Sequence, residues 1–251
     1  MLGSKHGIVP AVFLGIVPAV FLLLIISLPA FGKILFEDDF EGDTIGAEPA
    51  NFKKLDSPVN RAAATIKVVK DPDGKSGKTA NISNFALYVP KVAGSDDWTD
   101  WYWEWDWRWD TAGYPGNAYR IKDPSNWFHF SPRPDGISIH FWHYENTNWV
   151  LTTEAKFPFE LDTWYRFQQI MQGDHHIVKI KERDDDTPFD KIDPAIEQKD
   201  KTYKKGSLGG LGTDPGSTWV DNFIVYEDPQ DILAVDSNDK LAVTWGKLKG
   251  E

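Results

Sequence analysis

The chain has 251 residues, no cysteine and a formal net charge of −11 at pH 7. The absence of cysteine excludes a disulfide-stabilised scaffold and any cysteine-based zinc site or nucleophile. The acidic charge disfavours nucleic acid as a partner and suits calcium or neutral polymers.

The first 32 residues form an apolar leader. Lys5 is the only charged residue before Lys33, and an eight-residue unit, Gly7–Leu14, is repeated directly after itself. Ala30-Phe31-Gly32 offers the small residues that a signal peptidase accepts, which predicts cleavage before Lys33. The run is also long enough to span a bilayer, which takes ~20 apolar residues, so an uncleaved membrane anchor is the alternative. Both interpretations predict a secreted or cell-surface protein that touches a membrane only through residues 1–32, and only if they are uncleaved.

Short alternating segments separated by turn residues predict one antiparallel all-β domain over residues 33–227. The expected strands are Ile34–Phe40, Ala64–Lys70, Thr79–Val89, Trp101–Asp110, Asn117–Lys122, Trp127–Phe130, Gly136–Tyr144, Asn148–Glu154, Trp164–Met171, Ile177–Lys181, Lys205–Leu211 and Thr218–Tyr226. The fifth and sixth, seventh and eighth, and ninth and tenth of these are expected to form hairpins. Residues 184–203 predict a surface loop with one helical turn at Pro194–Gln198. Residues 228–251 form a tail that is either a final edge strand or a sorting segment.

Residues 101–110 alternate between tryptophan and polar residues. Alternation places one set on each face of a strand. One face carries Trp101, Trp103, Trp105, Trp107 and Trp109, and the other carries Tyr102, Glu104, Asp106, Arg108 and Asp110. An inward tryptophan face would form much of the core and leave the charged row to line a concave groove. An outward face would be an aromatic platform for sugar rings.

Two physical arguments oppose each other here. Five indoles would crowd a sandwich whose sheets lie ~10 Å apart. An exposed wall of that size would instead promote aggregation. We favour the core interpretation, with end residues such as Trp101 or Trp109 partly exposed.

Several short segments follow one another in an informative order. They are Phe36–Gly42, Asn117–Asp123, Trp127–Phe130, Trp164–Arg166, Gly173–Lys181, Lys205–Gly209 and Trp219–Tyr226. Together they resemble the concanavalin A-like lectin/glucanase superfamily, in its laminin-G-like branch. A relative with the same layout is the 3-keto-disaccharide hydrolase domain. The resemblance implies a two-sheet jelly-roll β-sandwich with a concave face that binds or cleaves glycans.

The resemblance also implies a structural calcium between the first and last strands. The matching positions are Asp39 or Glu41 on the first strand and Asp221 on the last, with a loop carbonyl near Gly74 or Gly77. Calcium prefers six to eight such oxygen ligands. The alternative is that these acids cap turns or pair with lysines.

The charged row offers a candidate catalytic pair, Glu104 and Asp106. Retaining glycosidases need two carboxyl groups ~5–5.5 Å apart. Glucanases that the chain resembles carry them in a Glu-x-Asp-x-x-Glu pattern, but here Trp109 stands where the second Glu belongs. Arg108 is a fixed cation that would hold neighbouring carboxylates ionised and weaken a general acid. The alternative is a cross-strand row of salt bridges.

The resemblance and the aromatic content favour a glycan-binding or adhesion module that does not catalyse a reaction. Its expected ligand is a carbohydrate polymer or oligosaccharide, held by Arg120, Trp127, His140, Trp142, Tyr144 and Trp149. His129, His140 and His143 are interpreted as groove or packing residues, since no three or four ligands for zinc can be assembled. A secreted glycoside hydrolase or lyase that uses Glu104 and Asp106 is the first alternative, and a structural surface domain is the second. The sequence does not decide whether the chain is an enzyme.

Overall fold

The computed structural model describes residues 33–229, except residues 76, 112, 134 and 214–215. The predictions for the leader, residues 1–32, and for the tail from residue 230 onward lie outside the described residues. Within the described part of the chain, no helix is long and apolar enough to cross a membrane.

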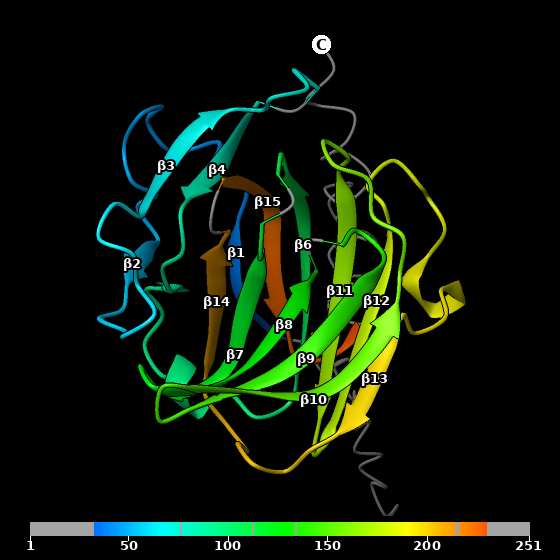
Figure 1. Cartoon of the computed structure of the whole chain (residues 1–251). Coiled ribbons are helices and arrows are strands. Elements are labelled where there is room, and N and C mark those ends of the chain that lie inside the picture. Colours follow the sequence, from blue (N-terminus) through cyan, green and yellow to red (C-terminus); the bar gives the residue numbers. More distant parts are fainter. Residues whose placement is uncertain (1–32, 76, 112, 134, 214–215, 230–251) are drawn as a thin grey trace, which may run out of the picture. The chain divides into compact units, whose positions relative to one another are not determined.

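The fold is an all-β jelly-roll sandwich of two antiparallel sheets (Figure 1). In spatial order, sheet A contains β13 (Ile196–Lys199), β12 (His175–Glu182), β11 (Tyr165–Gln172), β6 (Trp101–Trp109), β15 (Ser217–Tyr226), β4 (Lys78–Ser83) and β3 (Thr65–Lys70), with β1 (Ile34–Asp38) paired to β15. Sheet B contains β10 (Asn148–Lys156), β9 (Ser138–Glu145), β8 (Asn126–Pro132), β7 (Gly116–Asp123), β14 (Ser207–Gly212), β5 (Tyr88–Pro90) and β2 (Phe52–Lys54). Two single-turn 3-10 helices cover Ser95–Asp97 and Phe189–Lys191. The all-β fold class is therefore confirmed.

The three predicted hairpins form as β7–β8, β9–β10 and β11–β12. The expected single strand Thr79–Val89 is wrong, because the chain leaves sheet A after β4 and enters sheet B at β5. Asn84, which follows β4 directly, adopts a left-handed backbone with φ 58°, and this ends the strand. The chain crosses between the sheets again from β14 to β15, so these two last strands do not pair with each other.

The helical turn predicted at Pro194–Gln198 is wrong, because residues 196–199 form the edge strand β13. Ile196 and Gln198 are buried, whereas Glu197 and Lys199 are exposed. This alternation fits a strand that pairs with β12, and the pairing supplies the backbone hydrogen bonds that an isolated turn would lack.

The tryptophan face of β6 points between the sheets, as the core interpretation predicted. All five of its indoles are at most 4% exposed. Trp105 lies against Trp103 at a ring separation of 4.2 Å and stacks on Phe167 of β11 at 5.0 Å. The prediction that the end residues Trp101 and Trp109 are partly exposed was wrong. Trp101 packs on Tyr119 of β7, and Trp109 packs on Phe159 and Tyr165.

The indoles pack against sheet B with almost no void. Trp103, Trp105 and Trp107 lie with Gly210 and Gly212 of β14 around a void of only about 10 Å³. A side chain at Gly212 would clash with the backbone oxygen of Asn84, so this glycine allows β14 to approach the end of β4 closely. The crowding expected from five indoles therefore does not prevent a densely packed core.

Replacing Trp105 by alanine should lower the free energy of unfolding by ~3–5 kcal/mol, because the change removes a buried indole and leaves a cavity. Urea unfolding of the full chain measures the loss. Leu161→Ala is the control, since Leu161 is 47% exposed and its truncation should change stability by no more than ~0.5 kcal/mol. Equal midpoints for Trp105→Ala and the parent chain would contradict the assignment of Trp105 to the core.

Candidate functional site

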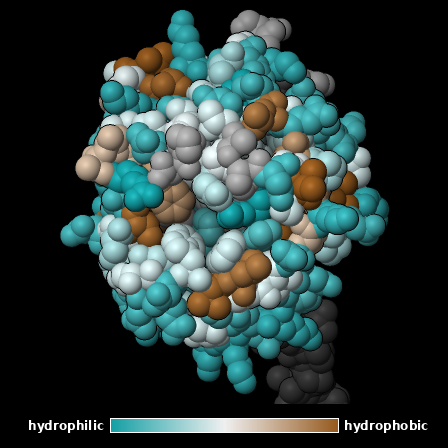
Figure 2. All heavy atoms as spheres, in the orientation of Figure 1, coloured by the Kyte–Doolittle hydropathy of each residue, from teal (hydrophilic) through white to brown (hydrophobic). Residues whose placement is uncertain are grey.

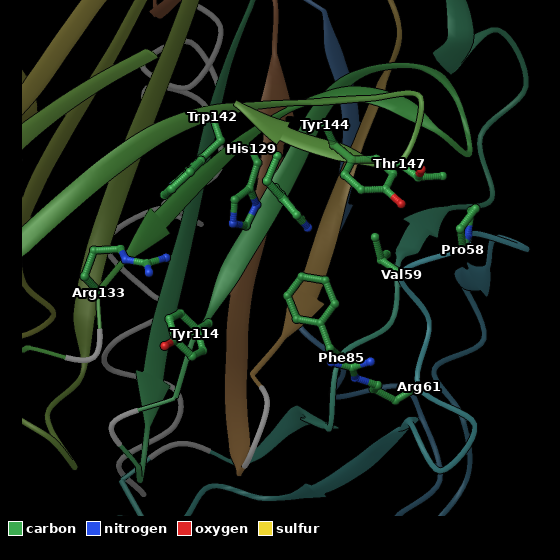
Figure 3. A pocket seen from close by; sticks show the side chains of 11 residues that line it. Pro58, Val59, Arg61, Phe85, Tyr114, His129, Arg133, Trp142, Tyr144 and Thr147 are labelled. Carbon is green, nitrogen blue, oxygen red and sulfur yellow. The ribbon is translucent and has the colours of Figure 1, made fainter. Parts of the chain in front are cut away.

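A pocket of about 470 Å³ lies on the outer face of sheet B (Figure 3). Its lining comes from β8, β9 and β10 and from loops that lie beside them. The lining residues are Pro58, Val59, Arg61, Phe85, Tyr114, His129, Arg133, Trp142, Tyr144, Thr147 and Trp149. Figure 2 shows one face of the molecule, where apolar side chains form separate patches on a mostly hydrophilic surface.

Strand alternation places aromatic side chains on this outer face. Phe128, Phe130 and Phe141 of β8 and β9 belong to the core between the sheets. His129, between Phe128 and Phe130, and Trp142, directly after Phe141, therefore point to the outer face and line the pocket.

The pocket has an aromatic floor. Trp127 is fully buried and lies 4.1 Å from the ring of Tyr144, which is itself 2% exposed. Trp149 packs on Tyr144 at 4.8 Å and on His129 at 5.0 Å, yet 42% of its surface is exposed. Phe85 and Trp127 contact the same indole edge-on at 6.2 and 6.4 Å. An indole that is fixed by neighbouring rings and still partly exposed can stack on a flat apolar ligand.

His129 is a neutral hydrogen-bonding group in this floor. Burial lowers its pKa to about 3, and the nearby Arg133 adds to the effect. The Nδ1 atom lies 2.9 Å from the backbone oxygen of Asn117, which can only accept, so Nδ1 carries the proton. The Nε2 atom of the neutral ring is therefore an acceptor. Gly116 is required beside this ring, because a Cβ there would clash with the imidazole.

Arg133 supplies a positive charge at the pocket. Its guanidinium lies 4.6 Å from the ring of Tyr114 and 5.4 Å from that of Trp142, in cation–π contact with both. Burial lowers its pKa, but an arginine remains charged at neutral pH. Arg61 is a second cation in the lining, which contains no aspartate or glutamate among the described residues.

Three of the predicted ligand-binding residues, Trp142, Tyr144 and Trp149, line the pocket together. Trp127 lies beneath them as support and is fully buried. His140 is beside Trp142 at a ring separation of 5.6 Å, and its Nε2 lies 3.7 Å from a carboxylate oxygen of Glu154.

Arg120 does not belong to this site. It is 1% exposed and donates hydrogen bonds to the backbone oxygens of Thr99 and Tyr203, at 2.8 and 3.0 Å. A bulge in β7 explains the difference, since Arg120 has a φ of 45° and the register of β7 against β8 shifts after Tyr119. Simple alternation along the strand therefore fails at this residue.

Sequence reasoning missed seven lining residues: Pro58, Val59, Arg61, Phe85, Tyr114, Arg133 and Thr147. Arg61, Phe85 and Tyr114 lie outside the strands, and Arg133 directly follows the end of β8. No periodic pattern marks such positions. His129 was interpreted as a groove or packing residue, and in the structure it is both.

The candidate catalytic acids lie on the outer face of sheet A, on the opposite sheet from the pocket. Glu104 Oε1 accepts hydrogen bonds from Tyr226 Oη at 2.6 Å and from Gln168 Nε2 at 2.8 Å. Burial raises the pKa of the Tyr226 hydroxyl, and the adjacent Glu104 raises it further. The charged row, which was expected to line a concave groove, therefore does not line the pocket on sheet B.

Asp106 is fully buried on the same face. Arg166 donates two hydrogen bonds to its carboxylate, from Nε at 2.6 Å and from Nη2 at 2.9 Å. Asn222 Nδ2 donates a third at 2.7 Å. Arg108 instead pairs with Asp162 at 2.7 Å. The charged row thus forms a network of ion pairs and hydrogen bonds, as the alternative interpretation describes.

The predicted calcium ligands do not form a cation site. Glu41 Oε1 accepts the backbone N–H of Lys78 at 2.8 Å, and Asp39 Oδ1 accepts the N–H of Glu41. The Lys78 ammonium donates to the backbone oxygens of Glu41 and Asp43, both at 2.7 Å. Asp221 is buried and accepts the N–H of the next residue. Within the described ranges, no three histidines or acids converge to hold a metal.

Comparison with known proteins shows the fold. No protein-family model matches the chain, and no curated protein matches it by sequence. The carbohydrate-binding module CBM66 from Bacillus subtilis has a similar structure, with a TM-score of 0.50 and 16% identity, over 66% of this chain and 97% of that module. A protein of unknown function with a galectin-like fold, also from Bacillus subtilis, has a TM-score of 0.50 and 14% identity, over 78% and 96% of the two chains.

A third similar structure is a xylan β-1,4-xylosidase from Bacillus halodurans, with a TM-score of 0.51 and 11% identity. It covers 80% of this chain, but this chain spans only 41% of the xylosidase. The chain therefore has the jelly-roll fold of these proteins, which is the fold that its sequence resemblance implied.

Removal of calcium should leave the melting temperature unchanged. The residues matched to a calcium site are engaged by Lys78 and by backbone N–H groups, so chelation removes no ligand that stabilises the native state. Thermal unfolding of the full chain in EDTA and in excess calcium tests this. A melting temperature that rises with calcium concentration would contradict it.

Acidification should destabilise the chain through two buried histidines. Burial lowers the pKa of His129 and of His176 to about 3, below the ordinary value of 6.5. Between these values the unfolded chain binds protons that the folded chain does not. The free energy of unfolding should therefore fall as the pH falls, by up to ~1.4 kcal/mol per pH unit for each histidine.

Urea unfolding between about pH 5 and 6.5, above the range where most carboxylates titrate, measures this slope. His129→Gln should make the slope shallower. His175→Gln, in the partly exposed β11–β12 hairpin, serves as the control that keeps it. An identical slope in His129→Gln and the parent would show that His129 is protonated in the folded chain.

Proposed function

We propose that the pocket on sheet B binds a carbohydrate polymer or oligosaccharide outside the cell and does not cleave it. The observation that carries this proposal is Trp149, which packs on Tyr144 and His129 in the pocket lining and yet is 42% exposed. Sugar rings present flat C–H faces that stack on such indoles. Trp142 offers a second ring in the same pocket.

The polar groups of the pocket suit a polyhydroxylated ligand. His129 Nε2 can accept a hydrogen bond from a sugar hydroxyl, and the arginines can donate to ring or hydroxyl oxygens. A volume of about 470 Å³ lies within the range of small-molecule sites, which is ~300–1,000 Å³. Aromatic walls with a few convergent polar groups are the usual composition of such sites.

The absence of acids from the described lining supports binding without hydrolysis. Glycosidases use a pair of carboxyl groups, one on each side of the scissile bond. Glu104 and Asp106 lie on the other sheet, where hydrogen bonds and an ion pair engage both. A similar fold in a module named for carbohydrate binding adds support by analogy alone. The apolar leader supports export, so we place this activity in the secreted or cell-surface compartment.

A panel of immobilised neutral and acidic glycans tests the proposal with the full chain. We expect binding to at least one glycan, weakened about tenfold or more in Trp149→Ala and Trp142→Ala, since buried aromatic contacts dominate binding energy. Trp219→Ala, on the outer face of sheet A, is the matched control that should bind normally. Unaltered binding in both pocket variants would contradict the assigned site.

Incubation of the full chain with the bound glycan should release no reducing ends, and Glu104→Gln should bind that glycan as the parent does. Measurement of reducing ends over a long incubation checks the first expectation. Steady release that is lost in Glu104→Gln would overturn the non-catalytic proposal in favour of a hydrolase that uses sheet A.

A further inference from the structure

The pocket concentrates positive charge in an acidic protein. The chain carries a formal net charge of −11, yet the described lining contains two arginines and no acid. Figure 3 places Arg133 and Arg61 at opposite sides of the pocket, with His129 and Phe85 between them. A neutral ligand would not require a cation at either end.

Arg133 has donors that the protein does not use. The described residues place no acid within 4 Å of its guanidinium and accept no hydrogen bond from that side chain. The guanidinium is nevertheless partly withdrawn from water by the rings of Tyr114 and Trp142. A partly desolvated cation with five N–H groups is most stable when an anion pairs with it.

The acids near Arg133 and His140 are engaged elsewhere. Asp135 accepts bonds from the backbone N–H groups of Ile137 at 2.9 Å and Ser138 at 3.1 Å, and from the Ser138 hydroxyl at 2.9 Å. Glu154 lies beside His140. Asp135 stabilises the charge of Arg133 from a distance, but neither carboxylate lines the pocket, so the side of the guanidinium that faces the pocket is open to an anion of the ligand.

His129 favours a hydrogen-bond donor on the ligand, whereas Arg133 favours an anion. Its Nε2 is an acceptor, and a carboxylate or sulfate has no hydrogen to donate to it. The ligand therefore has to present a hydroxyl at the centre of the pocket and an anion near its edge.

We infer that this pocket takes an acidic glycan, whose sugar rings carry a carboxylate or a sulfate that pairs with Arg133. The inference rests on the proposed function and names the ligand class of the same site. Arg133 binds the anion in two-point geometry, Trp149 and Trp142 stack on the sugar, and His129 accepts a hydroxyl.

Calorimetry with the full chain and matched oligosaccharides tests the inference. The probes are 1,4-linked gluco- and galacto-oligosaccharides of equal length, each in neutral, C6-carboxylate and C6-sulfate form. We expect one acidic form to bind at least about tenfold tighter than its neutral counterpart, with a difference that shrinks as salt is raised. Preference for the carboxylate or for the sulfate form identifies which anion is taken.

Arg133→Gln should weaken binding of the acidic form about tenfold more than binding of the neutral form, because both forms lose a hydrogen-bond donor but only the acidic form loses an ion pair. Lys67→Gln, an exposed position on β3 of sheet A, makes the same change in charge and should leave the preference intact. Arg133→Lys keeps the charge but loses the two-point geometry, so its preference for the acidic form should lie between those of Arg133→Gln and Lys67→Gln. The melting temperature of each variant checks folding.

Equal affinity for acidic and neutral forms, or an equal loss of both in Arg133→Gln, would overturn the acidic-glycan inference and leave the proposed function standing. Failure of every probe and of the wider glycan panel to bind would instead overturn the proposed function itself.

Discussion

The burial of five alternating indoles in β6 is the constraint on which the structure depends. Their bulk fixes which face of sheet A points inward, and a one-residue slip would place the charged row in the core. The two sheets close around the indoles so tightly that a void of only about 10 Å³ is left beside Trp103, Trp105 and Trp107. Packing of this kind fixes the register of the neighbouring strands as well, because β11 and β15 both pair with β6 along nearly its whole length.

Because of this constraint, sheet A contributes mainly to stability, and the outer face of sheet B is available for binding. Since the tryptophans of β6 are buried, their polar neighbours on sheet A form a self-contained network around Asp106 and Arg166. The face left for a ligand is the outer side of sheet B, where a second aromatic group, built on Trp127 and Tyr144, supports Trp149. Charge divides in the same way: Asp106 and Arg108 of sheet A are paired with ions of opposite sign, whereas the described pocket lining on sheet B contains arginines but no acid.

Strand periodicity predicted much of the fold and part of the site. It located β6 and the three hairpins, because these depend on local alternation and turn residues, whereas the pocket residues Trp142, Tyr144 and Trp149 were predicted from the family resemblance and the aromatic content. It failed where the backbone departs from regular geometry, as at the bulge of Arg120 and the turn at Asn84. Arg133 and Arg61 could not be predicted either, since the fold alone brings together segments that lie far apart in the sequence.

Fluorine NMR of the full chain labelled with 5-fluorotryptophan tests the central claim most directly. Resonances are assigned by single replacement of each tryptophan and compared in H₂O and D₂O, which shifts only solvent-exposed fluorines. The account predicts that the five resonances of β6 are insensitive to the solvent, whereas that of Trp149 shifts. Solvent-sensitive resonances throughout β6 would show that its indoles face outward, and the division between a packed sheet A and a binding sheet B would be wrong.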